Sequence, residues 1–191
     1  MRSNLFLRTV AAFSILVGAE WSPAIADPPH VPPDPATIAA FQDFGKGVQQ
    51  YIKVRKAMPE VHTTRHRKEI VDRRQALAQA IREARADAKQ GDIFTPEISK
   101  HFILVIRSTL QGSKGANVRR TLRSEEPVAN LLLTVNSAYP EDLPLATIPP
   151  TLLRRLPQLP ERLAYRIVGH DLVLQDTEAR LVIDLIPGAL P

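Results

Sequence analysis

Five histidines are the side chains of this 191-residue chain that are best suited to hold a metal ion. Two of them have the spacing of a ligand pair, because His62 and His66 stand four residues apart and would share one face of a helix. No glutamate completes the arrangement of a zinc-protease motif, and His62 falls in an expected loop. The other three histidines, His30, His101 and His170, have no ligand spacing, so we predict no metal site and interpret His62 and His66 as solvated loop histidines.

Three aspartates near the end of the chain, Asp171, Asp176 and Asp184, could in principle supply an acid/base pair. Each stands at the end of an expected strand or beside a turn, where aspartate commonly accepts hydrogen bonds from backbone N–H groups. We favour this structural role over catalysis.

Nucleophilic catalysis has less support in the sequence. The chain contains no cysteine, and Ser108, Ser113 and Ser137 stand outside the G-x-S-x-G motif of a nucleophilic serine. Residues 112–115 (GSKG) lack the preceding strand and the spacing of a phosphate-binding P-loop. We predict no catalytic residue and no cofactor, and we favour a protein that is not an enzyme.

Arginines are concentrated in the first part of the chain after residue 26. Residues 27–126 carry 18 basic and 12 acidic side chains, whereas residues 127–191 carry 5 and 7. Several arginines have carboxylates at helical spacing, so ion pairing on a solvated surface is the interpretation that we favour. Arginines that stay unpaired and converge would instead form an anion-binding surface. The arginines are Arg73, Arg74, Arg82, Arg85, Arg119, Arg120 and Arg123, and the carboxylates are Glu69, Asp72, Glu83 and Asp87.

An amphipathic segment carries the first four of these arginines. Apolar residues recur along it at helical spacing, with polar residues on the other faces, and Gly91 is placed to end a helix in a left-handed conformation. The pattern predicts one helix from Arg67 to Gly91, about seven turns long, which needs partners to cover its apolar stripe. The stripe is Ile70, Leu77, Ile81, Ala84 and Ala88.

Helices are also predicted on both sides of this central segment. The first should begin near Pro35, capped by Asp34 or Thr37, and end at Pro59, which makes it antiparallel to the central helix. Gly45 and Gly47 interrupt it and predict close packing against a neighbouring helix. A third helix should start at residues 95–97 (TPE), and residues 114–123 could form a short fourth helix.

A change to a Pro-rich composition at Pro127 marks the second half. Residues 129–135 are compatible with a strand or a buried helical turn, and residues 149–153 suggest a brief helical turn. Alternating segments at 163–167, 171–174 and 181–185 predict a two- to three-stranded antiparallel meander that packs on the helices. The predicted fold is therefore α+β, with a bundle of three or four helices in residues 37–126 and a connector and meander in residues 127–191.

The first 26 residues have the pattern of a secretory signal peptide. Arg2 and Arg8 accompany an apolar run at Val10–Ala19 that is too short to span a bilayer, and residues 24–26 (AIA) predict cleavage between Ala26 and Asp27. We expect an exported, periplasmic protein with no transmembrane segment after cleavage. Residues 27–36 contain five prolines and predict an extended linker.

Leu156 to Pro191 carries an LP-x-LP, Tyr-Arg-x-x-Gly, Leu-x-Leu-x-Asp and Ile-x-Asp pattern. This pattern resembles the C-terminal signature of a family of exported bacterial proteins of unknown function, and residues 91–97 (GDIFTPE) and 136–140 fit the same family. This resemblance implies export and architecture but no activity. Residues 165–186 are also similar to the terminal hairpin of the periplasmic nickel/cobalt-homeostasis family, from which we transfer no metal function.

These observations favour a non-enzymatic binding or scaffolding module of the cell envelope. Its expected partner is an envelope protein or an anionic envelope component, and no motif supports binding to nucleic acid. A periplasmic metal-stress or homeostasis protein is the second hypothesis, and a small hydrolase is the third.

Overall fold

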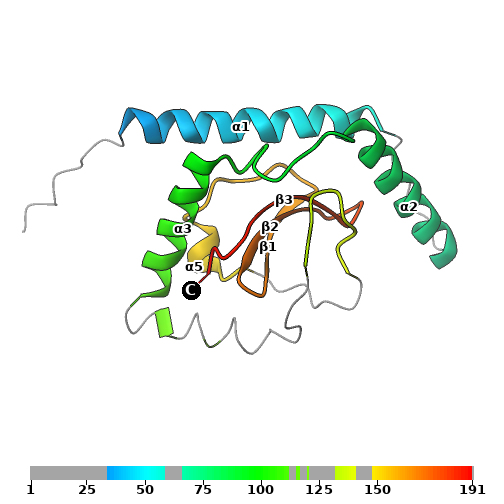
Figure 1. The fold of residues 1–191 in the computed structure, drawn as a ribbon. Helices are drawn as coiled ribbons and strands as arrows, with labels where there is room; N and C mark the ends of the chain where they lie inside the picture. The colour runs from blue at the N-terminus through cyan, green and yellow to red at the C-terminus, as the bar shows by residue number, and fades with distance from the viewer. Residues whose placement is uncertain are drawn as a thin grey trace, which may run out of the picture. The chain divides into compact units, whose positions relative to one another are not determined.

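A computed structural model describes residues 34–58, 66–111, 115–116, 120, 132–140 and 148–190. The predicted signal peptide and residues 27–33 of the predicted linker lie outside these ranges, as do His62, Ser113, Arg119 and Arg123. The described residues have an α+β fold, which confirms the predicted class (Figure 1).

Helices form where the capping and breaking signals predict them. Helix α1 spans Pro35–Lys56 and α3 spans Pro96–Leu110, each with a proline in its first turn. The Thr95 hydroxyl caps α3 by accepting a hydrogen bond from the Ile98 N–H. The brief turn predicted at residues 149–153 is helix α5, Pro150–Leu153.

The predicted meander is a three-stranded antiparallel sheet. Strands β1 (Leu163–Val168), β2 (Asp171–Asp176) and β3 (Leu181–Ile186) are hydrogen-bonded in sequence order. Gly169, at a φ of 56°, takes the first position of the two-residue loop between β1 and β2, where a left-handed residue is required. The register between β2 and β3 shifts between Leu174 and Gln175, where Ile183 is the extra residue of β3.

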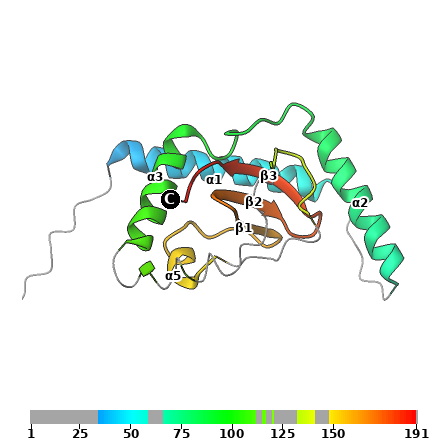
Figure 2. The ribbon, with the colours of Figure 1, turned by 60° about the horizontal axis from the view of Figure 1, so that its bottom comes forward.

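Both faces of the sheet are covered. The main core joins one face to α1, α3, α5 and the C-terminal half of α2, the helix Arg67–Ala84 (Figures 1 and 2). On the other face, Leu133 and Tyr139 pack on Val173, Val182 and Leu185. Residues 132–140 therefore form an irregular layer of their own over the sheet.

The central helix is shorter than the sequence predicts. Helix α2 ends at Ala84 rather than Gly91, and Arg85 takes a non-helical backbone with φ −127° and ψ 36°. The side chain of Arg85 and its carbonyl both bind Asn136, so tertiary hydrogen bonds replace the next helical turn. Gly91 does adopt a left-handed φ of 93°, but it does so in the loop that precedes α3.

The glycines of α1 also depart from the prediction. A Cβ atom at Gly47 would lie 3.4 Å from the Cα of Ile93, so Gly47 permits close approach of a loop rather than of a helix. Gly45 has nothing among the described residues within 4 Å of such a Cβ position. In the described part of residues 129–135, neither a strand nor a helix is present.

Candidate anion-binding groove

Residues 136–140 run beside β3 and form one wall of a groove. Val182 exchanges backbone hydrogen bonds with Asn136 and Ser137, and the Tyr139 N–H donates to the Arg180 carbonyl at 2.7 Å. Asn136 holds a left-handed φ of 63°, which this residue type tolerates better than most. The segment thus extends the edge of the sheet toward α2.

Helix α2 forms the opposite wall and is fixed at its C-terminal end. Leu77, Ala78 and Ile81 are buried there. Arg82 donates from Nε to the Asn136 carbonyl at 2.9 Å, and Arg85 donates to the Asn136 Oδ1 atom and to the Ile183 carbonyl at 3.1 and 3.2 Å. These contacts join α2 to both the layer and the sheet.

Arg85 has a structural role. Its guanidinium lies 5.2 Å from the centre of the Tyr51 ring, in a cation–π contact. Burial lowers the pKa of Arg85, while the charges of Tyr51, Asp184 and Asp92 act in the opposite direction. Arg85 therefore anchors α2 and leaves the groove to other arginines.

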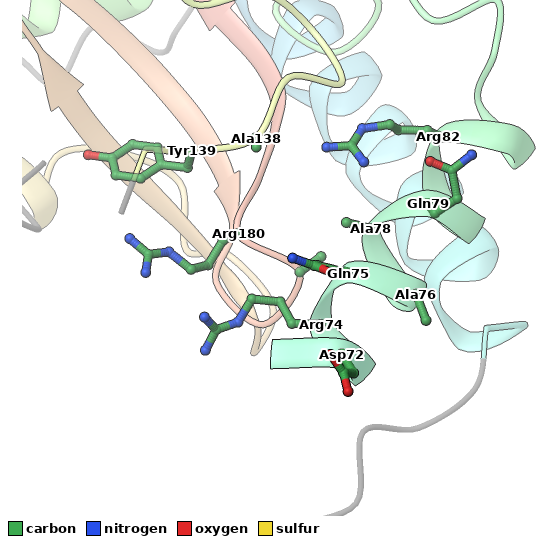
Figure 3. A pocket seen from close by; sticks show the side chains of 11 residues that line it. Asp72, Arg74, Gln75, Ala76, Ala78, Gln79, Arg82, Ala138, Tyr139 and Arg180 are labelled. Carbon is green, nitrogen blue, oxygen red and sulfur yellow. The ribbon is translucent and has the colours of Figure 1, made fainter. Parts of the chain in front are cut away.

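The groove between these walls has a volume of about 710 Å³. This is within the range of roughly 300–1,000 Å³ that is usual for small-molecule sites. Three arginines, two glutamines and one aspartate give it its polar lining, and the alanines 76, 78, 138 and 179 supply short apolar side chains (Figure 3). The charged and amide residues are Asp72, Arg74, Gln75, Gln79, Arg82 and Arg180, and Tyr139 completes the lining.

Positive charge dominates this lining. Arg74, Arg82 and Arg180 face a single carboxylate, Asp72, which is itself hydrogen-bonded to Lys68 at 2.7 Å. A guanidinium group presents several N–H donors in a planar fork that matches carboxylate and phosphate oxygens. The arrangement is chemically suited to bind an anionic group, and it brings together no nucleophile and general base.

The sequence indicated two of these arginines as members of a face that could bind anions, and it did not indicate the third. Arg74 and Arg82 belong to the predicted Arg-rich face, whereas Arg180 comes from the turn between β2 and β3. It has a left-handed φ of 50°, uncommon for a residue with a side chain. Only the pairing of β3 with residues 136–140 brings Arg180 opposite α2.

The other arginines and carboxylates of the predicted face have different neighbours. The Nη2 atom of Arg73 lies 3.7 Å from the Oε2 atom of Glu69, and the two side chains form an ion pair at helical spacing, of the kind predicted. Glu83 accepts a hydrogen bond from Gln79 at 2.8 Å. Arg120 is exposed in the short described piece of residues 114–123, and Asp87 lies in the turns after α2. The structure thus divides the predicted face between ion pairs, an anchor and the groove.

Asp176 and Asp184 have the structural role that the sequence favoured. Asp184 is fully buried and accepts hydrogen bonds at 2.8–2.9 Å from the backbone N–H groups of Gly91, Ile93, Phe94 and Leu185. It thereby fixes the loop before α3.

Asp176 is the centre of a second buried network. It accepts a hydrogen bond from the Tyr51 hydroxyl at 2.7 Å and two from the backbone N–H groups of residues 178 and 179. The Nε atom of Arg55 lies 3.3 Å from it, and the Nη2 atom of Arg55 pairs with Glu178. The network fastens α1 to the turn between β2 and β3.

Asp171 and the remaining candidates are dispersed. Asp171 accepts a hydrogen bond from the Gly188 N–H. The Nε2 atom of His101 lies 3.2 Å from the Thr37 hydroxyl. The Ser137 hydroxyl accepts a hydrogen bond from the Thr134 N–H. His66 is the residue before α2, His170 is in the β1–β2 turn, and Ser108 donates to the Val105 carbonyl. Within the described ranges, no group of three or more histidine or carboxylate side chains could hold a metal ion.

Comparisons of the chain with protein-family profiles, with curated proteins and with solved structures gave no match. Among the helices that the structure describes, none is both long enough and apolar enough to cross a membrane.

Proposed function

We propose that this protein is an exported, non-enzymatic binding module of the cell envelope that takes an anionic envelope component in the groove between α2 and residues 136–140. The observation that carries the proposal is the convergence of Arg74, Arg82 and Arg180, from two distant parts of the chain, on one pocket of about 710 Å³. The predicted signal peptide supports the location, because export would bring the groove to envelope anions.

A binding role fits the chemistry of the groove better than catalysis. The side chains that line it are three arginines, two glutamines, four alanines and Tyr139, with Asp72 as the one carboxylate. Arginine keeps its proton throughout the physiological pH range, so it orients and neutralises an anion but does not transfer protons. The predicted metal-homeostasis role has no comparable cluster among the described residues.

Inorganic phosphate is the simplest probe of the groove. The purified protein should be stabilised saturably when phosphate replaces chloride at constant ionic strength, because a ligand that binds only the folded state raises its stability by mass action. A phosphate concentration of 100 times Kd would add about 2.7 kcal/mol to the free energy of unfolding. Thermal unfolding followed by circular dichroism measures the effect.

Matched variants separate the groove from general surface charge. Arg180→Gln should remove most of the phosphate response, whereas Arg73→Gln, which removes the same charge from a residue outside the groove lining, should retain it. Stabilisation that fails to saturate, or that falls equally in both variants, would contradict the proposed site. N-terminal sequencing of protein recovered from the periplasm should begin at Asp27, and recovery from the cytoplasm alone would contradict the location.

A further inference from the structure

The three arginines of the groove are divided between its two ends. Figure 3 shows Arg82 at one end, beside Ala138, and Arg74 together with Arg180 at the other. Gln75 and Ala78 lie between them on α2 (Figure 3). One end therefore holds one guanidinium and the other holds two, and the carboxylate of Asp72, which lies beside Arg74 at the second end (Figure 3), is hydrogen-bonded to Lys68.

The helix rise estimates the separation of these ends, and the opposite wall sets an upper limit on it. Arg82 follows Arg74 by eight positions in α2, and a rise of about 1.5 Å per residue places their Cα atoms about 12 Å apart along the helix. On the opposite wall, Arg82 is bonded to the Asn136 carbonyl and Arg180 to the Pro140 carbonyl. Four residues span at most about 14 Å when fully extended, and the left-handed Asn136 makes this segment shorter than that limit.

Hydrogen bonds to the backbone hold the two ends apart. The Nε atom of Arg82 donates to Asn136 at 2.9 Å, and the Nη2 atom of Arg180 donates to Pro140 at 3.0 Å. An arginine fixed at its own end cannot swing across the groove to share one small anion with the other end. A single phosphate group would therefore use only part of the positive charge.

We propose that the ligand of the groove carries two phosphate groups about 12 Å apart, joined by a polar spacer of the size of a short saccharide. The pair Arg74 and Arg180 matches a phosphomonoester, whose charge at pH 7 approaches −2, and Arg82 matches the second phosphate. The spacer lies over alanine methyl groups that are too short to enclose an acyl chain, with the Gln75 amide beside it. This inference rests on the proposed function, since it names the ligand class of the same groove.

A series of linear alkanediol bisphosphates tests the spacing. Three members, with phosphate separations shorter than, close to and longer than about 12 Å, are titrated into the protein by calorimetry, each beside the alkyl monophosphate of the same chain length. The matched bisphosphate should bind about 100-fold more tightly than its monophosphate, because the second contact becomes intramolecular. The shorter bisphosphate should bind little more tightly than its own monophosphate.

Substitutions test whether both ends of the groove contribute to this gain in affinity. Arg82→Gln and Arg74→Gln should each bring the matched bisphosphate down to the affinity of the monophosphate, whereas Arg73→Gln should preserve the gain. Far-ultraviolet circular dichroism of every variant verifies that it is folded.

The outcomes distinguish this inference from the function on which it rests. Equal affinity for monophosphates and bisphosphates at every length, with Arg180→Gln still abolishing binding, would overturn the two-phosphate ligand and leave the anion site standing. Absence of binding to every member, inorganic phosphate included, would overturn both.

Discussion

At the scale of single residues, two buried aspartates show why a carboxylate at a strand end need not be catalytic. Asp184 has no exposed surface, yet four backbone N–H groups satisfy it, and Asp176 is satisfied by a tyrosine, an arginine and two N–H groups. A buried carboxylate is stable only with such partners, because its desolvation is costly. Each aspartate thereby fixes a loop to the sheet.

We expect Asp184→Asn to destabilise the protein by about 3 kcal/mol. The asparagine side chain keeps one acceptor oxygen, and its NH₂ group would face backbone donors that are left unsatisfied. Urea denaturation measures the change. Asp171→Asn is the matched control, since Asp171 is partly exposed and accepts one described hydrogen bond, from Gly188. A loss no greater than that of the control would show that the loop holds without the charge.

At the scale of elements, α2 depends on the contacts of its last two turns. No residue from Arg67 to Ala76 is fully buried, whereas Leu77, Ala78 and Ile81 are, and the hydrogen bonds of Arg82 and Arg85 lie at the same end. The groove wall is therefore positioned by a few contacts at one end of the helix. Its first half extends away from the sheet in both views (Figures 1 and 2).

We expect Arg85→Lys to loosen α2 even though the charge is preserved. Lysine cannot donate simultaneously to the Asn136 side chain and to the Ile183 carbonyl, so the protein should lose about 1–2 kcal/mol of stability. Hydrogen exchange measured by mass spectrometry should show faster exchange in residues 77–84. The same substitution at the exposed Arg107 of α3 should leave exchange in that segment unchanged, and equal effects of the two would refute the anchoring role.

At the scale of the whole molecule, the three tyrosines link folding to alkaline pH. Burial is the main cause that raises the pKa of Tyr51, Tyr139 and Tyr165 above the ordinary value of 10.0, and Asp176 raises that of Tyr51 further. They are all the tyrosines of the chain. The folded protein therefore holds phenolic protons that the unfolded chain releases near pH 10.

This difference sets the sign of the pH dependence. The contribution of the tyrosines to stability is fully present below pH 10 and is lost as pH rises further, because the unfolded state then binds fewer protons. Each tyrosine lowers the free energy of unfolding by up to about 1.4 kcal/mol per pH unit in that range. Tyrosinate absorbance should appear together with the loss of circular dichroism, and Tyr51→Phe should reduce the steepness of the loss. Tyrosinate forming near pH 10 in the folded protein would contradict this prediction.

The sequence by itself determined the elements of this fold. Proline and threonine at residues 35 and 95–96 predicted the starts of α1 and α3, and alternation with a turn at Gly169 predicted β1 and β2, because these signals act over a few neighbouring residues. The Arg-rich face that supplies Arg74 and Arg82 was visible for the same reason. The signal peptide predicted in residues 1–26 and the linker predicted in residues 27–36 stay predictions over residues 1–33, which lie outside the described ranges.

Only the tertiary structure decided where α2 ends and which arginines share a groove. The end of α2 depends on hydrogen bonds between Arg85 and Asn136, which are 51 residues apart. The groove depends on residues 136–140 pairing with β3, which places Arg180, in the turn before β3, across the groove from α2. Helical periodicity contains no information on such pairings, because their free energy comes from contacts that exist only once the chain has folded.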